Sequence, residues 1–168
     1  APAGRVLTGK ANVIRLSDVV AERVDWLWEG RIPRGMITII EGEPDLGKST
    51  ITVDLAARVS TGAPMPFETT RRPPADVVIL SAEDHLAMTQ RPRLDAAGAD
   101  ATRIWAMQGI SLPGDEDAAV SLLRDRYHLE ELIRAKRAGL LIIDPLMAYL
   151  GSETDSHKDQ DVRRVLSP

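Results

Sequence analysis

The sequence predicts a three-layer α/β fold, in which a mainly parallel β-sheet carries helices on both faces. Short, wholly apolar runs recur along the chain, and segments with helical spacing of apolar residues separate them. Because these runs do not alternate polar and apolar residues, they are typical of strands buried on both sides of a parallel sheet. A glycine-rich segment with a lysine also connects the first apolar run to the first helical segment. Such a connection is typical of α/β proteins that bind phosphate groups.

The composition suits one globular domain and excludes several kinds of chemistry. A length of 168 residues is that of a single domain, and we assign residues 1–25 to an N-terminal lead and residues 26–168 to the domain. The absence of cysteine excludes disulfides, zinc–thiolate sites and thiol nucleophiles. A net charge of -4 argues against a basic surface that coats nucleic acid. The sequence has no apolar span of membrane length and no signal-peptide pattern, so we expect a cytoplasmic protein without membrane contact.

The first predicted strand and helix follow each other closely. Residues 36–41 form an apolar, β-branched run that suits a buried strand. Residues 48–59 have helical spacing, which places Ile51, Leu55 and Val59 on one face. We therefore expect a strand, a short loop and a helix in succession.

The other predicted elements continue the alternation of strands and helices. They are a helical turn that begins at Ser17 and carries Val19, Val20 and Val24, a long proline-rich loop (61–76), a strand (77–80), a helix (85–98), a strand (102–107), a loop (108–117), an extended segment (118–124), a helix (125–138), a strand (140–143), a loop (151–160) and the start of a helix (161–166). The two later helices are expected to be capped by Asp84 and Asp125. Their expected buried residues are Leu86, Met88 and Leu94, and Leu129, Leu132 and Ile133.

Two residue pairs near the first strand and helix need interpretation. Trp26 and Trp28 either pack the edge of the core, which we favour, or flank the base of a bound nucleotide. Arg71 and Arg72 are interpreted as a solvated surface pair, although long loops in compact domains are often functional.

Residues 42–49 fit the phosphate-binding pattern G-x-x-x-x-G-K-[ST], between the first predicted strand and helix. Gly42 and Gly47 leave room for the backbone to wrap around an anion, which the free N–H groups at the helix start attract. Lys48 is expected to reach the outer phosphates, and the Ser49 hydroxyl is expected to ligate Mg2+. The predicted nucleotide-binding residues are Gly42, Glu43, Pro44, Asp45, Leu46, Gly47, Lys48, Ser49 and Thr50.

Carboxylates follow two other predicted strands. In parallel sheets ligands bind outside the carboxyl ends of the strands, so these side chains belong to the predicted site. Asp144 ends the run over residues 140–143 and is expected to hold Mg2+ directly or through water. Glu83 is expected to orient a water molecule and take its proton, which is the role that phosphate hydrolysis requires.

We expect neither a metal site built from histidines nor a Ser-His-Asp catalytic triad. His85, His128 and His157 lack metal-ligand spacing. The sequence also lacks the G-x-S-x-G elbow of a Ser-His-Asp hydrolase.

From about residue 26 to its end, the chain resembles the RecA-like P-loop ATPases, and among them the branch of the plasmid replicative helicase RepA, with an AAA-type ATPase domain. The resemblance rests on GEPDLGKST, on LSAEDH followed by RPRLDAAGAD, and on LLIIDPLMAYLG. It implies a RecA-like core that binds ATP and Mg2+, with Glu83 as the catalytic glutamate and Asp144 as the Walker B acid. It also implies a homo-oligomeric ring, commonly a hexamer, with ATP between neighbouring subunits and nucleic acid in the central channel. Single-stranded DNA is the nucleic-acid partner that we expect.

Two departures from this family limit what we expect of the chain. Asp45 stands where relatives often have glycine, and its charge is expected to weaken nucleotide affinity unless the side chain points outward. Relatives continue beyond the position of Pro168 with strands that sense the terminal phosphate and with basic residues that complete a neighbour's site. We therefore expect a C-terminally incomplete core that hydrolyses ATP weakly alone, since a trans-acting arginine contributes about 10³ to 10⁵ in rate.

Three functions are compatible with these residues. The leading hypothesis is an ATP-hydrolysing domain of a helicase-type ATPase in DNA replication or repair. The alternative is a nucleotide-dependent assembly or regulatory module with little hydrolysis. A small-molecule kinase is the third, but the sequence has few arginines that could form the lid of such an enzyme, which argues against it. The expected DNA-facing loop over residues 151–160 is mainly acidic, which is also compatible with a flexible loop that binds nothing.

Overall fold

The computed structural model describes residues 12–112, 115–118 and 120–150. It divides the chain into two units, residues 1–38 and residues 39–168. The loop predicted over residues 151–160 and the helix predicted over residues 161–166 lie outside the described residues.

A short antiparallel pair of strands forms the regular part of the first unit. Its elements are the 3₁₀ turn η1 (Leu16–Asp18) and the strands β1 (Trp26–Trp28) and β2 (Ile32–Pro33). Leu27 is buried between its two half-buried tryptophan neighbours, and the Arg31 guanidinium lies 4.9 Å from the centroid of the Trp28 ring. The prediction of a longer helical turn was wrong, because η1 ends before the valines expected on it, Val19, Val20 and Val24, which are exposed.

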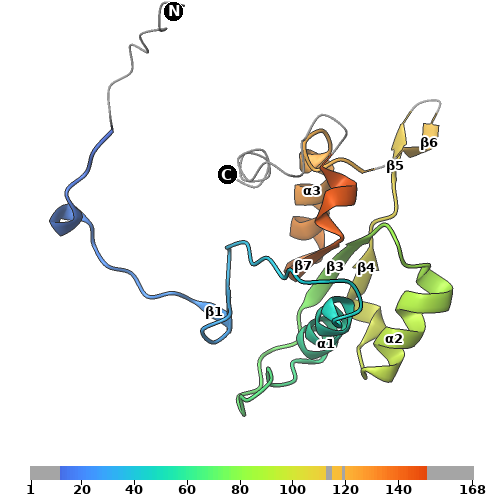
Figure 1. Ribbon diagram of the computed structural model, residues 1–168, viewed down its shortest axis with the longest axis horizontal. Coiled ribbons are helices and arrows are strands. Elements are labelled where there is room, and N and C mark those ends of the chain that lie inside the picture. The colour runs from blue at the N-terminus through green and yellow to red at the C-terminus, as the bar shows by residue number, and fades with distance from the viewer. Residues whose placement is uncertain (1–11, 113–114, 119, 151–168) are drawn as a thin grey trace, which may run out of the picture. The chain divides into compact units, whose positions relative to one another are not determined.

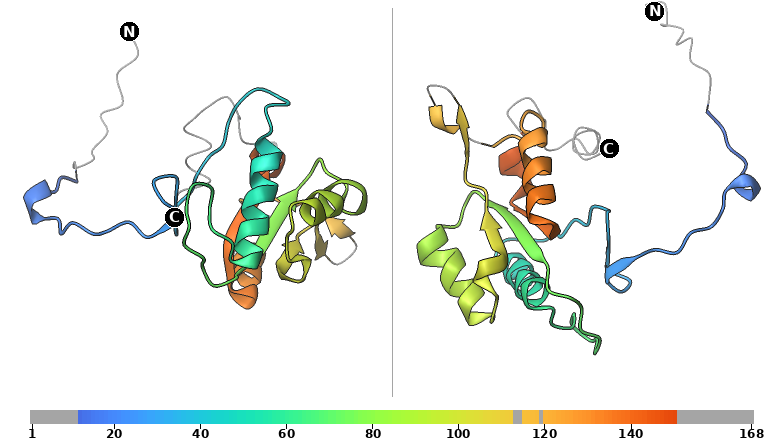
Figure 2. Two further views of the ribbon diagram at one scale, coloured as in Figure 1. Left: turned by 90° about the horizontal axis from the view of Figure 1, so that it is seen from below. Right: turned by 180° about the vertical axis from the view of Figure 1, so that it is seen from behind.

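The second unit confirms the predicted α/β fold, a RecA-like P-loop core built on a parallel sheet in the order β4-β3-β7 (Figure 1). Its elements are α1 (Lys48–Thr61), β3 (Asp76–Ser81), the π-helical turn η2 (Leu86–Gln90), α2 (Arg91–Ala96), η3 (Ala101–Arg103), β4 (Ile104–Ala106), β5 (Ile110–Leu112), β6 (Asp115–Ala118), α3 (Arg126–Lys136), β7 (Ala138–Asp144) and η4 (Leu146–Tyr149). Helices α1 and α2 cover one face of the sheet and α3 the other, as the views of Figure 2 show.

Alternation along β3 explains why helices cover both faces of the sheet. Val78 and Leu80 belong to the cluster that Leu129 of α3 joins, with Leu132 and Ile133 packed against it. The intervening residues point the other way, and Ile79 lines a pocket together with residues of α1 and α2. Each face of the sheet is therefore buried by a different helix layer.

Of the nine residues predicted to lie on buried helix faces, four are buried, three are half-buried and two are exposed. Leu55 and Val59 of α1 and Leu94 of α2 are buried, as predicted. Ile51 and Met88 were predicted to be buried and are exposed instead. Ile51 lies in the first turn of α1, and Met88 is the third residue of η2.

The strand predicted over residues 36–41 is not formed. The segment has no regular secondary structure, and Met36 and Ile39 are 64% and 61% exposed. An apolar run becomes a strand only where its N–H and C=O groups find a partner strand. Among the described strands, the parallel sheet contains only β4, β3 and β7, so residues 36–41 have no such partner.

The region between β4 and α3 also differs from the prediction. Where a loop was predicted over residues 108–117, β5 and β6 form an antiparallel pair that aligns Ile110 with Ala118 and Leu112 with Asp115. Of the extended segment predicted over residues 118–124, Ala118 belongs to β6 and residues 122–124 form a turn. The acidic composition of β6 does not favour a strand, so strand pairing overrides local propensity here.

The proline-rich loop between α1 and β3 is ordered by its own contacts. Gly62 has φ +68°, and a Cβ there would collide with the carbonyl oxygen of Arg72. The Arg72 backbone N–H donates to the Gly62 carbonyl at 3.1 Å, and its guanidinium pairs with Glu68 at 2.7 Å. The interpretation of Arg72 as a solvated surface residue was therefore wrong, since only 22% of its side chain is exposed.

Asp125 was predicted to cap α3, but its side chain makes no capping hydrogen bond. It stabilises the turn before the helix instead. Its buried carboxylate accepts the backbone N–H of Ser121 at 2.8 Å and two guanidinium N–H groups of Arg124 at 3.1 and 3.0 Å. These contacts, chiefly the hydrogen bond from Arg124, hold the pKa of Asp125 below its usual value despite the opposing effect of burial.

We expect Gly62→Ala to destabilise the protein clearly more than Gly98→Ala. Both glycines have φ near +70°, but a Cβ at Gly98 meets nothing within 4 Å. Gly98→Ala should therefore cost only the left-handed strain of about 1–2 kcal/mol, whereas Gly62→Ala adds the collision with Arg72. Urea unfolding of both variants measures the difference, and equal losses would contradict the close approach of the loop to Gly62.

We expect Asp125→Asn to reduce stability at neutral pH and to lose this effect in acid. Because the folded-state pKa lies below the ordinary value of 3.8, the stabilisation is complete above pH 3.8 and disappears as the pH falls through the folded-state value. The free energies of unfolding of wild type and variant should therefore converge in acid. Glu131→Gln on the exposed side of α3 is the control, and parallel pH profiles for wild type and Asp125→Asn would contradict the assignment.

Candidate functional site

The predicted phosphate loop leads directly into α1. Gly47 occupies the N-cap position with φ +81°, and no side chain caps the helix. The backbone N–H groups of the first helical turn have no partner within the helix, so they can bind an anion. Gly42, at the other end of the loop, has φ +155°.

Lys48 closes the loop in this structure. Its ammonium group donates to the carbonyl oxygens of Gly42 and Glu43, both at 2.8 Å. An ammonium group has three N–H donors, so these two bonds leave one for a phosphate oxygen. The same contacts hold the start of the loop against the start of the helix.

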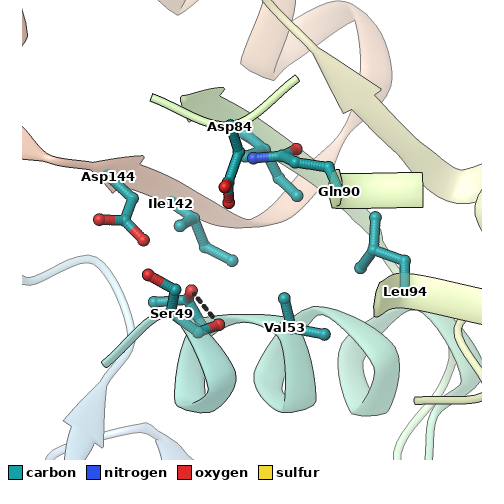
Figure 3. Close-up of a pocket in the computed structure, with 9 residues that line it drawn as sticks. Ser49, Val53, Asp84, Gln90, Leu94, Ile142 and Asp144 are labelled. Atoms are coloured by element: carbon teal, nitrogen blue, oxygen red, sulfur yellow. Dashed lines mark hydrogen bonds between the residues drawn. The ribbon is translucent and has the colours of Figure 1, made fainter. Parts of the chain in front are cut away.

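A pocket lies between the start of α1 and the carboxyl ends of β3 and β7, and both Ser49 and Asp144 line it (Figure 3). Parallel pairing places Ser81 of β3 opposite Asp144, and the Ala82 N–H donates to the Asp144 carbonyl at 3.3 Å. The two predicted magnesium ligands are therefore brought together, although they lie far apart in the sequence. Their roles as ligands stay predictions.

The second carboxylate that lines the pocket is Asp84 and not Glu83. Glu83 is exposed, whereas Asp84 points into the pocket and its carboxylate pairs with Arg93 at 3.0 Å (Figure 3). The capping role predicted for Asp84 belongs to His85, whose Nδ1 accepts the Met88 N–H at 3.3 Å.

A bend in the chain explains why Asp84 lines the pocket and Glu83 does not. If the alternation of β3 continued, Glu83 would point to the same face as Ile79, which lines the pocket. The strand ends at Ser81, however, and residues 82–84 form a bend. Alternation therefore no longer decides which side chain faces the pocket.

Thr52 and Gln90 also line the pocket, and sequence reasoning missed both. The Thr52 hydroxyl donates to the Ser49 carbonyl at 2.9 Å, which is a contact within the first turns of α1. The position of Thr52 three residues after Ser49 on a helix could have revealed it. Gln90 had no such signal, because it reaches the pocket through the packing of η2 and α2.

Tyr149 lies near the end of β7 and is buried. Burial raises its pKa, and the negative charge of Asp144 adds to this effect. Its carbonyl accepts the Leu122 N–H at 2.8 Å, which ties η4 to the turn before α3. The segment after Asp144 is therefore anchored in the core.

The residues present suit a hard divalent cation that also has phosphate ligands. In the described part of the chain, no group of three or more His, Cys, Asp or Glu residues could hold a metal ion alone. Ser49 and Asp144 offer a hydroxyl and a carboxylate, which are the oxygen donors that Mg2+ prefers. The remaining ligands would have to come from phosphate and water, as in other P-loop sites.

Asp45 lies in the phosphate loop with φ +63° and an exposed side chain. This is the left-handed region that favours glycine, and a non-glycine residue there costs about 1–2 kcal/mol. The non-glycine residue at this position therefore has a structural cost, and the effect of its charge on nucleotide binding stays a prediction.

A protein-family model described as "AAA domain" matches residues 6–168. Neither the search of curated proteins nor the search of solved structures found a match. Among the described residues, no helix is both long and apolar enough to cross a membrane.

We expect Asp45→Gly to bind ATP, the predicted ligand, about fivefold more tightly, because it removes a negative charge beside the phosphates. It should also raise the free energy of unfolding, since glycine adopts φ +63° without strain. Asp45→Asn is the matched control, because it removes the charge and keeps a Cβ. Isothermal titration and urea unfolding measure both effects, and unchanged affinity in both variants would show that the Asp45 charge does not act on the ligand.

Proposed function

We propose that this chain, which belongs to the AAA domain family, is the ATPase domain that drives a helicase of the RepA type in DNA replication or repair. The observation that carries the proposal is the meeting of Ser49 and Asp144 beside the phosphate loop. A hydroxyl and a carboxylate on opposite sides of one pocket are what a phosphate-bound Mg2+ requires.

The loop and the helix start are proposed to bind the ATP phosphates. The N–H groups that follow Gly47 and the ammonium group of Lys48 supply positive charge there. Ser49 and Asp144 are proposed to hold Mg2+, Ser49 through its hydroxyl and Asp144 directly or through water. When bound, Mg2+ neutralises the charge that develops on the phosphates during hydrolysis.

Glu83 is proposed to orient the attacking water and take its proton, as the family resemblance implies. Its exposed side chain lies next to Asp84 on the bend that borders the pocket. Catalytic contacts often form only when substrate binds. We therefore propose that Glu83 turns toward the phosphates in the ATP complex.

The proposed partners are further copies of the chain and single-stranded DNA. The family resemblance supports a ring, commonly a hexamer, in which ATP lies between neighbouring subunits. The exposed Lys48 contacts fit a phosphate site that a second subunit covers.

A second candidate function is a nucleotide-dependent assembly module with slow hydrolysis. The position of Glu83 outside the pocket favours it, because ATP can then be bound without an oriented water. No such observation favours a small-molecule kinase. Hydrolysis that single-stranded DNA stimulates would favour the helicase, whereas a mass that increases with ATP and turnover that ignores DNA would favour the assembly module.

We expect Lys48→Ala to lose most ATP binding and Glu83→Gln to keep binding while its turnover falls at least about 100-fold. The first change removes a phosphate contact, and the second removes the proton acceptor. Nucleotide binding is measured by equilibrium dialysis, and turnover by phosphate release.

The matched control for the first variant is Lys136→Ala, because Lys136 lies on α3, where its ammonium contacts the Trp105 ring. It should bind ATP as wild type does. Unchanged hydrolysis by Glu83→Gln would exclude Glu83 as the catalytic carboxylate, and undiminished ATP binding by Lys48→Ala would exclude the phosphate loop as the binding site.

A further inference from the structure

Asp84 occupies the pocket without a role in the function proposed above. Its carboxylate points into the pocket from the bend after β3, and that of Asp144 lies near Ser49 at the end of β7 (Figure 3). Only 26% of the Asp84 side chain is exposed. Asp84 therefore faces the place where the phosphates and their metal ion are expected, whereas Glu83 does not.

An ion pair with α2 fixes the orientation of Asp84. The Arg93 Nη1 donates to Asp84 Oδ2 at 3.0 Å. This bond uses one carboxylate oxygen and leaves Oδ1 to accept another hydrogen bond. Arg91, two residues earlier on α2, pairs instead with Asp95 of its own helix at 2.8 Å. Of these two arginines, Arg93 alone contacts the pocket carboxylate.

A carboxylate in this position can accept hydrogen bonds from water molecules bound to Mg2+. Mg2+ binds six oxygen ligands and usually keeps several water molecules. Each bound water donates hydrogen bonds, and a carboxylate that lines the pocket can accept them.

We propose that Asp84 is a second acidic residue of the Mg2+ site, where it accepts hydrogen bonds from metal-bound water, and that Arg93 is its positioning residue. The proposal rests on the proposed function, because it requires ATP and Mg2+ at this pocket. It gives Asp84 a role separate from the orientation of the attacking water, which is assigned to Glu83.

Mg2+ dependence of ATP binding tests the proposal on the full 168-residue chain. Radiolabelled ATP is held at a fixed, subsaturating concentration while Mg2+ is increased from zero in the presence of EDTA. Asp84→Asn should raise the Mg2+ concentration at half-maximal binding about tenfold, as expected for the loss of an outer-shell ligand. Arg93→Gln should raise it by a smaller factor, since the carboxylate remains but loses its support. Neither change should weaken ATP binding without metal, because the phosphate loop is intact.

Two controls separate this role from neighbouring ones. Arg91→Gln changes the same helix without touching Asp84, and Glu131→Gln removes an exposed carboxylate of α3. Both should keep the wild-type Mg2+ midpoint. Thermal unfolding in EDTA shows whether each variant is folded, and if Asp84→Asn is not, Arg93→Gln carries the test with the same expected direction.

The possible results distinguish this proposal from the function on which it rests. A wild-type Mg2+ midpoint in Asp84→Asn, with normal ATP binding by the wild type, overturns the proposal and leaves the proposed function standing. A loss of turnover at saturating Mg2+ with an unchanged midpoint overturns it too, because Asp84 would then act in the chemical step. Failure of the wild type to bind ATP overturns both.

Discussion

The parallel pairing of β3 with β7 is the constraint on which the candidate site depends. Their Cα partners run from Val77 opposite Leu140 to Ser81 opposite Asp144, so both strands end at the same level. A shift by one residue would turn every buried side chain of a strand to the other face, so core packing fixes this register. The site carboxylates consequently meet at one edge of the sheet.

Helix α1 supplies the other wall of the pocket by the same means. Leu55 and Val59 bury its middle and end against the sheet, and its first turn extends beyond the buried area. The residues that would hold phosphate and metal therefore lie at the exposed end of an element that is anchored elsewhere. Arg93 is likewise an exposed residue on an anchored helix, because it pairs with Asp84 while its neighbour Leu94 is buried in the core.

Prediction from the sequence succeeded where burial imposes a repeating pattern. The strands over β3, β4 and β7 and the helix face of Leu129, Leu132 and Ile133 were recognised because both depend on apolar residues that pack into one core. It failed where pairing decides, as at residues 36–41, which are apolar but unpaired, and at β5 and β6, which are paired despite an acidic sequence.

The sequence alone predicted the fold class, the position of the loop over residues 42–49 and the ends of the strands that carry acidic residues. These features follow from local composition and spacing, which a chain retains in any arrangement. Only the tertiary structure decided which acidic side chain enters the pocket, because the bend after Ser81 interrupts the alternation that would have pointed Glu83 inward. The contact of Arg93 with Asp84 likewise depends on how α2 packs, which no local pattern encodes.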